Sequence, residues 1–364
     1  MRSKVKCMIN KIKKHLGPYY RTIKRNIRRQ DYFKNEHVEL PEHITLAFTL
    51  KCRAACPHCY FIQKEHAFNQ KELVSEELLN KIFVSKFSSS IVSMSCGGGE
   101  ALLHPNFFEL LNLLPIHKLK GIQVVTNGLS LQDEYIVKKI LEQNILTNIH
   151  ISLDAADEFN YVRKKGIKEC KFDLICQNIK KIATILKGKT TVGLSFVVYA
   201  DDLANIKEMI SLATELNVDY CHVTTLHLAN LDNKLSTNTV KEMPFAYQEI
   251  MRNTGYGIDI IIQPPLHDKY MQYYCESLDK HLSLSPSGIL STCCHLPWNK
   301  EIGKFDEFDY NPVNNRYALE MRRKFILAKK ENNKMLLPEE CLYCNRRLTG
   351  SYYYKKDNKK WFFY

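Results

Sequence analysis

Three cysteines lie close together in the sequence, in the pattern Cys52-x3-Cys56-x2-Cys59, directly after a predicted strand. Three thiolates in one short loop can bind three irons of a [4Fe–4S] cube, which leaves the fourth iron free to bind another group. An open coordination position separates a reactive metal centre from a closed, structural one. Zinc is the alternative, but it usually takes four ligands in paired spacing. We therefore interpret this loop as an open iron–sulfur site.

A second group of cysteines lies near the C-terminal end, where Cys275 and Cys293 are followed by the close pair Cys341-x2-Cys344. Four cysteines in this arrangement can close a complete tetrathiolate site. Such a site suits either a fully ligated [4Fe–4S] cluster or a zinc ion in a ribbon. We predict a cluster here and keep zinc as the alternative.

Glycine and polar residues follow two further predicted strands. Gly98, Gly99 and Glu100 follow the second strand, while Ser152 and Asp154 lie at the end of the fourth. Glycines expose backbone groups, and a carboxylate can face an ammonium group. Alternation places Ser152 and Asp154 on one side of their strand, and polar residues at the C-terminal ends of barrel strands are typical of active sites. An ordinary turn and a helix-capping aspartate are the alternatives.

Strand and helix patterns alternate from residue 44 on, which predicts parallel βαβ units. Helical periodicity indicates helices at 75–86, 105–114, 131–143, 172–187 and 205–216. Apolar or β-branched runs indicate strands at 44–50, 91–96, 121–126, 148–154, 190–199 and 220–228. Six such strands predict an α/β fold, a partial (β/α)6 TIM-like barrel with a small C-terminal cysteine-rich domain.

The chain divides into five predicted segments. They are a basic amphipathic arm, the barrel, a connecting region, the cysteine-rich domain and an aromatic and basic tail, at 1–43, 44–235, 236–274, 275–344 and 345–364. Within the connecting region we expect a helix near 240–252 and a strand at 258–262.

The cysteine spacing after the first strand resembles that of the radical S-adenosylmethionine (radical SAM) superfamily. The segment Gly97-Gly98-Gly99-Glu100 is similar to the Gly-Gly-Glu-Pro segment of that family, and Thr126-Asn127-Gly128 resembles a turn common in it. The resemblance implies a [4Fe–4S] cluster at which S-adenosylmethionine is reductively cleaved. It further implies a 5′-deoxyadenosyl radical that abstracts a hydrogen atom from the substrate.

The resemblance also implies roles for single residues. The glycines and the glutamate would hydrogen-bond the methionyl ammonium, although Ala101 stands where the family has proline. Ser152 and Arg163 would contact the cofactor carboxylate, with a surface arginine as the alternative for Arg163. The residues expected to bind the cofactor are Gly98, Gly99, Glu100, Asn127, Ser152, Asp154 and Arg163.

The second cysteine group resembles the twitch half of the SPASM/twitch appendages of that superfamily, which house an auxiliary [4Fe–4S] cluster. The spacing from Gly288 favours Cys293 over Cys294 as a ligand. The expected ligands are Cys275, Cys293, Cys341 and Cys344. A fully ligated cluster can only transfer electrons, so it could complete a two-electron oxidation of the substrate. A flavodoxin- or ferredoxin-type protein is the expected electron donor.

Composition and charge limit the remaining possibilities. With 45% hydrophobic residues the chain can bury a core, and no apolar run suits a membrane span or a secretory signal. We therefore expect a cytoplasmic protein. Residues 1–30 hold eleven Lys or Arg and no acidic residue, which accounts for most of the net charge of +13. Such an arm could lie on the anionic inner membrane surface, hold a polyanionic carrier, or pack on the barrel.

These observations lead to three hypotheses about function. The first is a radical SAM oxidoreductase that dehydrogenates a small molecule or a carrier-bound sugar or cyclitol. The second is a maturase that crosslinks or epimerises a ribosomal peptide, although such relatives often carry a longer leader-recognition domain before the barrel. The third is a zinc-binding module for nucleic acid, but no groove-reading motif accompanies the arm, so nucleic acid is not expected. His222, His227 and Tyr199 lie near strand ends as candidate proton acceptors.

Overall fold

The structure is a computed structural model, and the description below covers the greater part of the chain. The N-terminal arm up to residue 35, His227 and Cys294 lie outside the described residues. The described residues are 36–59, 71–199, 202, 205–225, 247–253, 255–263, 272–293, 301–308, 311–342, 344, 347 and 351–363.

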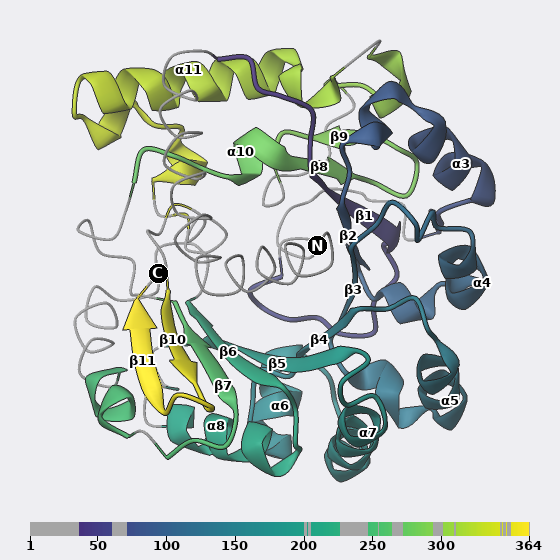
Figure 1. Ribbon diagram of the computed structural model, residues 1–364, viewed down its shortest axis with the longest axis vertical. Coiled ribbons are helices and arrows are strands. Elements are labelled where there is room, and N and C mark those ends of the chain that lie inside the picture. Colours follow the sequence, from purple (N-terminus) through teal and green to yellow (C-terminus); the bar gives the residue numbers. More distant parts are fainter. Residues whose placement is uncertain are drawn as a thin grey trace, which may run out of the picture.

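An 11-stranded sheet forms the centre of the molecule (Figure 1), in the order β11-β10-β7-β6-β5-β4-β3-β2-β1-β8-β9. Strands β1 to β6 pair in chain order and all run parallel, as the alternation of strand and helix predicts. The strands are β1 His43–Thr49, β2 Ser93–Gly98, β3 Gly121–Thr126, β4 Asn148–Ser152, β5 Thr191–Val198, β6 Tyr220–Thr225, β7 Asp259–Ile262, β8 His281–Leu284, β9 Leu290–Ser291, β10 Tyr352–Lys355 and β11 Lys360–Phe363.

The sheet extends beyond the six predicted strands at both ends. Strand β7 adds parallel to β6, and β8 adds parallel to β1. The hairpin β10–β11 joins β7 in antiparallel pairing, and β9 pairs antiparallel with β8. Segments that the sequence suggested as a connection, a cysteine-rich domain and a tail therefore supply strands to the sheet of the barrel.

Helices cover the outer, convex side of the curved sheet (Figure 1). They bury one face of each strand, as on β3, where Ile122 and Val124 are buried and their neighbours are not. The helix at 158–165 was not predicted, because it is short and its residues are mostly polar. The helices are α3 Glu76–Val84, α4 Phe107–Asn112, α5 Glu134–Glu142, α6 Glu158–Lys165, α7 Phe172–Ile185, α8 Ile206–Glu215, α10 Ser277–Lys280 and α11 Arg316–Lys330.

A buried arginine attaches α11 to the rest of the molecule. Arg322 has no exposed surface, and its guanidinium donates to the carbonyl oxygens of Glu36 and Leu278, each at 2.6 Å. It also donates to Val313 O at 2.9 Å and to Asn314 Oδ1 at 2.8 Å. One side chain therefore joins α11 to α10, to the 3-10 turn Pro312–Asn314 and to the segment that leads into β1.

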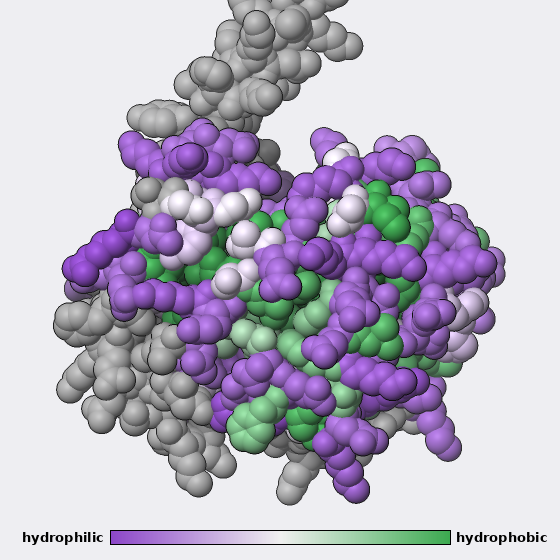
Figure 2. Space-filling model, turned by 90° about the horizontal axis from the view of Figure 1, so that it is seen from below, coloured by the Kyte–Doolittle hydropathy of each residue, from purple (hydrophilic) through white to green (hydrophobic). Residues whose placement is uncertain are grey.

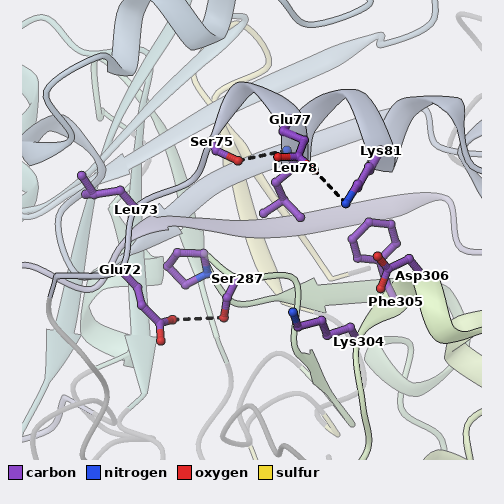
Figure 3. A pocket seen from close by; sticks show the side chains of 11 residues that line it. Glu72, Leu73, Ser75, Glu77, Leu78, Lys81, Ser287, Lys304, Phe305 and Asp306 are labelled. Atoms are coloured by element: carbon purple, nitrogen blue, oxygen red, sulfur yellow. Dashed lines mark hydrogen bonds and ion pairs between the residues drawn. The ribbon is translucent and has the colours of Figure 1, made fainter.

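A small pocket lies where α3 meets the turn between β8 and β9 (Figure 3). Ser287 Oγ donates to Glu72 Oε2 at 3.1 Å across it. Gly288 has a φ of +81°, and a Cβ there would lie 3.1 Å from Leu78 and from Phe305. Glycine allows both this backbone conformation and the close packing of the turn against the barrel.

Figure 2 shows one face of the molecule, on which hydrophilic side chains cover most of the described surface and hydrophobic ones show between them. Among the described residues, no helix combines the length and the apolar character that crossing a bilayer requires.

Candidate active site

The loop after β1 brings the thiols of Cys52, Cys56 and Cys59 close together. Burial raises the pKa of Cys52 and raises that of Cys56 to about 12, and nearby thiols add to both rises. Asn127 Nδ2 donates to Cys52 Sγ at 3.3 Å, and the backbone N–H of Ala54 donates to the same sulfur at 3.4 Å. The structure thus gathers the three predicted ligands, whose protons a bound metal would displace.

The arrangement fits a cluster held by three cysteines. The loop supplies three half-buried thiols, and N–H groups aimed at a ligating sulfur are a feature that tunes iron–sulfur clusters. Among the described residues, no three His, Cys, Asp or Glu side chains converge tightly enough for one metal ion. The cysteines of a cube each bind a different iron, so they are spaced more widely than the ligands of one zinc ion.

The glycine segment at the end of β2 packs directly on the backbone that leads into the cysteine loop. Gly98 has a φ of +109°, and a Cβ there would lie 2.4 Å from Thr49 O. At Gly99 a Cβ would lie 2.5 Å from Lys51 O. Backbone N–H groups of Gly99 and Glu100 donate to Thr49 O and Lys51 O, each at 2.8 Å. These glycines therefore position the cysteine loop, and their contact with the cofactor stays a prediction.

Glu100 is buried and joins the end of β2 to the end of β3. Its carboxylate accepts hydrogen bonds from the backbone N–H of Asn127 at 2.8 Å and of Leu102 at 3.4 Å. Burial raises the pKa of Glu100, and these N–H groups act against the rise. Asn127 O in turn accepts from the Tyr161 hydroxyl at 2.9 Å. Glu100 thus contacts Asn127, which in turn contacts Cys52. The contact of Glu100 with an ammonium group stays a prediction.

Asp154, directly beyond β4, forms a buried ion pair with Lys165 of α6 at 2.6 Å. Its carboxylate also accepts from Ser152 Oγ at 2.8 Å and from the Val197 N–H at 2.9 Å. Burial would raise the pKa of Asp154, but the Lys165 charge outweighs it and holds the pKa well below its usual range. Lys165 O accepts from the Ala55 N–H at 2.7 Å, which ties this pair to the cysteine loop.

The last turn of α6 places its three basic residues differently. Arg163 is 45% exposed; it donates to Asn160 Oδ1 at 3.1 Å and lies 3.8 Å from Asp202. Lys164 is buried, forms an ion pair with Asp202 and donates to Asp154 O at 2.7 Å. The structure therefore does not bring Arg163 next to Ser152, and its cofactor contact stays a prediction. Sequence reasoning missed both lysines because basic residues at a helix C-terminus are usually solvated.

A row of hydrogen-bonded polar side chains runs across the concave face from β2 to β6. Ser95 Oγ donates to Gln123 Oε1 at 3.1 Å, and Gln123 Nε2 donates to Asn148 Oδ1 at 2.8 Å. The Tyr220 hydroxyl lies 2.8 Å from His150 Nδ1 and 3.4 Å from the Asn148 amide. Barrel interiors are usually filled by branched apolar residues, so this face suits a polar ligand better than dry packing.

Gly193 makes this row possible. Strand register places Gly193 between His150 on β4 and Tyr220 on β6. A Cβ at Gly193 would lie 2.0 Å from the Tyr220 ring. Only glycine lets the ring lie across β5 so that its hydroxyl reaches His150, and nothing in the apolar pattern of β5 indicated this.

The candidate proton acceptors have defined neighbours. The Tyr199 hydroxyl contacts His58 Nδ1, and His58 belongs to the cysteine loop. Burial lowers the pKa of His58. His222 packs edge-on against His150, with ring centroids 6.2 Å apart. The structure thus places Tyr199 beside the cysteine loop and His222 beside the polar row, while His227 lies outside the described residues.

The second cysteine group also comes together in the fold. Cys275 and Cys341 are buried in one cluster under α11, and Cys293 packs against it. Burial raises the pKa of Cys341, and the thiols of Cys275 and Cys344 add to the rise. Cys344 N–H donates to Cys341 O at 3.4 Å, which closes the turn of the pair. The structure therefore brings Cys275, Cys341 and Cys344 together, with Cys293 packed against the same cluster. That the four bind one cluster stays a prediction.

The structure places a loop with three cysteines at the C-terminal end of β1, in a partial barrel of parallel strands. Residues 46–213 match the model of the Radical SAM superfamily. This part of the chain is a radical SAM domain. A radical SAM domain implies a [4Fe–4S] cluster and S-adenosylmethionine as cofactors, so these two cofactor predictions are confirmed.

Two curated relatives illustrate the range of similar proteins. The chain is 30% identical over 145 residues to the antilisterial bacteriocin subtilosin biosynthesis protein AlbA of Bacillus subtilis. The matched residues cover 40% of this chain and 31% of AlbA. It is 24% identical over 219 residues to a probable GTP 3′,8-cyclase of Sulfurisphaera tokodaii, covering 60% of this chain and 66% of the relative. The chain thus spans less than two thirds of either protein.

Two solved structures share the fold over most of the chain. Streptococcus suis SuiB bound to precursor peptide SuiA has a TM-score of 0.57 at 14% identity, covering 90% of this chain and 75% of SuiB. Native anSMEcpe with bound AdoMet and Kp18Cys peptide has a TM-score of 0.53 at 18% identity, covering 85% of this chain and 89% of that protein. The predicted α/β partial barrel is confirmed, and the similarity in fold extends past the barrel into the C-terminal segment.

Proposed function

We propose that this radical SAM enzyme oxidatively modifies a ribosomally made peptide. The observation that carries the proposal is the presence in one fold of two cysteine groups, an open set of three and a closed set of four. A cluster bound by the set of three would leave one iron for S-adenosylmethionine, and a cluster bound by the set of four would be suited to electron transfer alone. Together they support a reaction that removes a hydrogen atom and then an electron and a proton from the substrate.

The residues of this chain would divide the work as follows. Cys52, Cys56 and Cys59 would hold the first cluster, which supplies the 5′-deoxyadenosyl radical from S-adenosylmethionine when bound. The glycine segment at the end of β2 fixes the start of their loop, and the Asp154–Lys165 pair fixes its middle through Ala55. The four C-terminal cysteines would hold the auxiliary cluster. A flavodoxin- or ferredoxin-type donor and an anionic partner for the N-terminal arm stay predictions.

The substrate class is proposed from the relatives and from the polar concave face. AlbA is a bacteriocin biosynthesis protein, and the structures of SuiB and anSMEcpe contain peptides. These observations favour a peptide over the sugar or cyclitol expected from the sequence. The probable GTP 3′,8-cyclases favour a nucleotide as the second candidate. A hydrogen-bonding face such as the row from Ser95 to Tyr220 is compatible with either polar ligand.

The first experiment tests the radical SAM chemistry. Anaerobic reconstitution is expected to give about eight irons per chain, and Cys52→Ala with Cys56→Ala should remove about half of them. Reduced wild-type protein should release 5′-deoxyadenosine from S-adenosylmethionine, while the double variant should not. The matched control is Cys170→Ala with Cys176→Ala, two cysteines outside both groups. Equal iron and equal cleavage in all three proteins would contradict the proposal.

The second experiment tests the substrate class. The enzyme is co-expressed with each short peptide encoded beside its gene, and the peptides are examined by mass spectrometry. Loss of two hydrogen atoms from one peptide, abolished by Cys52→Ala with Cys56→Ala, is the expected result. Conversion of GTP by the reconstituted enzyme with no change in any peptide would favour the nucleotide instead.

A further inference from the structure

A buried cation that no prediction anticipated lies against the turn of the second cysteine group. Arg347 is 3% exposed, and its Nε donates to Gln272 O at 2.8 Å. Its Nη1 donates to the carbonyl oxygens of Cys341 and Leu342 at 2.8 and 2.9 Å. Its backbone N–H donates to Cys344 O at 3.1 Å. The guanidinium is therefore fixed between the Cys341–Cys344 turn and the segment that leads to Cys275.

No carboxylate in the described part of the chain forms an ion pair with Arg347, whose guanidinium donates there to carbonyl oxygens. Burial lowers the pKa of this guanidinium, while the thiols of Cys341, Cys344 and Cys275 act to raise it. An unpaired buried charge is costly, so a stable fold is expected to supply an anion nearby. A [4Fe–4S] cube bound by four thiolates carries a net negative charge, and three of the predicted ligands, Cys275, Cys341 and Cys344, lie near enough to act on this cation.

We propose that Arg347 is the counter-charge of the auxiliary cluster and raises the reduction potential of that cluster. This proposal rests on the proposed function, because it needs a cluster at these four cysteines. Adding one electron to the cluster increases its negative charge by one. A fixed cation nearby stabilises the reduced form more than the oxidised form, and more strongly in a buried, low-dielectric place. Arginine stays charged throughout, so no proton has to be taken up with the electron. The result is a better acceptor for the electron that leaves the substrate radical.

The test isolates the auxiliary cluster in the full-length chain. A Cys52→Ala, Cys56→Ala, Cys59→Ala parent is reconstituted anaerobically, and its cluster is titrated with dithionite and mediators under EPR detection. Arg347→Gln, which removes the charge, is expected to lower the midpoint potential. Arg347→Lys, which keeps the charge, is expected to stay closer to the parent. Arg323→Gln, at an arginine 63% exposed on α11, is the control and should leave the potential unchanged.

Each outcome decides the matter. An unchanged potential in Arg347→Gln with its iron retained would overturn the proposal. If Arg347→Gln loses its iron while Arg347→Lys keeps it, the charge is needed to hold the anionic cluster and the proposal stands. Equal loss of iron in both variants would mean that Arg347 only holds the backbone of the turn in place, and this would overturn the proposal. Zinc in place of iron in the parent would also overturn it, whereas cleavage of S-adenosylmethionine by the wild type would still support the radical SAM site.

Discussion

Asp154 has a φ of +66°, in the left-handed region that few residues other than glycine adopt. Its carboxylate satisfies Ser152 Oγ and the Val197 N–H and pairs with Lys165, all inside the fold. Backbone strain of this kind persists only where the surroundings over-determine it. Because Lys165 O also holds the N–H of Ala55, the ion pair supports the cysteine loop as well as the end of β4.

Asp154→Asn is expected to lower the free energy of unfolding by about 3 kcal/mol, because it leaves the Lys165 ammonium buried without its counter-charge. Asparagine tolerates positive φ, so the backbone is not the cause of the loss. Urea denaturation of the purified chain measures the change. Glu77→Gln, which breaks an exposed pair with Lys81 on α3, should leave the free energy of unfolding almost unchanged, because solvent screens exposed pairs. A similar loss in both variants would contradict a special role for the buried pair.

The same pair predicts a pH dependence. The pKa of Asp154 is lowered in the fold, so the stability it contributes is fully present above the ordinary aspartate pKa and is lost as the pH falls towards the folded value. The difference in unfolding free energy between wild type and Asp154→Asn should therefore be constant above about pH 5 and narrow below about pH 4. Urea denaturation across this range tests it, and a difference that grows on acidification would refute the assignment.

At the scale of elements, the end of β2 and the start of the cysteine loop form one packed unit. Gly99→Ala would place a Cβ 2.5 Å from the Lys51 carbonyl oxygen, which is backbone and must move with the loop. We expect this variant to fold but to incorporate clearly less iron on reconstitution, because the positions of the three thiols change.

Gly97→Ala supplies the matched control for this experiment, since a Cβ at Gly97 meets nothing within 4 Å. It should bind as much iron as the wild type. The measurement is iron per chain together with the visible absorbance of the cluster. Equal loading of the two alanine variants would show that the loop is positioned without the close contact at Gly99.

At the scale of the whole molecule, the C-terminal segment is attached by the pairing of β8 with β1 and by Arg322. Arg322→Leu should lower the free energy of unfolding by roughly 3 kcal/mol, because several buried carbonyl oxygens lose a charged donor. Hydrogen exchange should rise in α11 and in residues 36–42. Arg323→Leu changes the exposed neighbour and should have little effect. Equal exchange in the two variants would mean that β-pairing alone holds the segment.

The sequence by itself determined the chemistry and the repeating units of this protein. Ligand chemistry depends on residue type and short spacing, so Cys52, Cys56 and Cys59 could be predicted as ligands without a fold. Apolar periodicity likewise located β1 to β6 and most of the helices that cover them, because one face of each must be buried.

Only the tertiary structure decided what lies beside these elements. The strands β7 and β8 join the parallel sheet through contacts distant in sequence, which local patterns do not encode. Lys164, Lys165 and Arg347 appear as solvated basic residues in the sequence, yet the fold buries them against carboxylates, carbonyl oxygens and thiols. Whether a charge is solvated or paired depends on what the rest of the chain brings to it, and that is a property of the folded molecule.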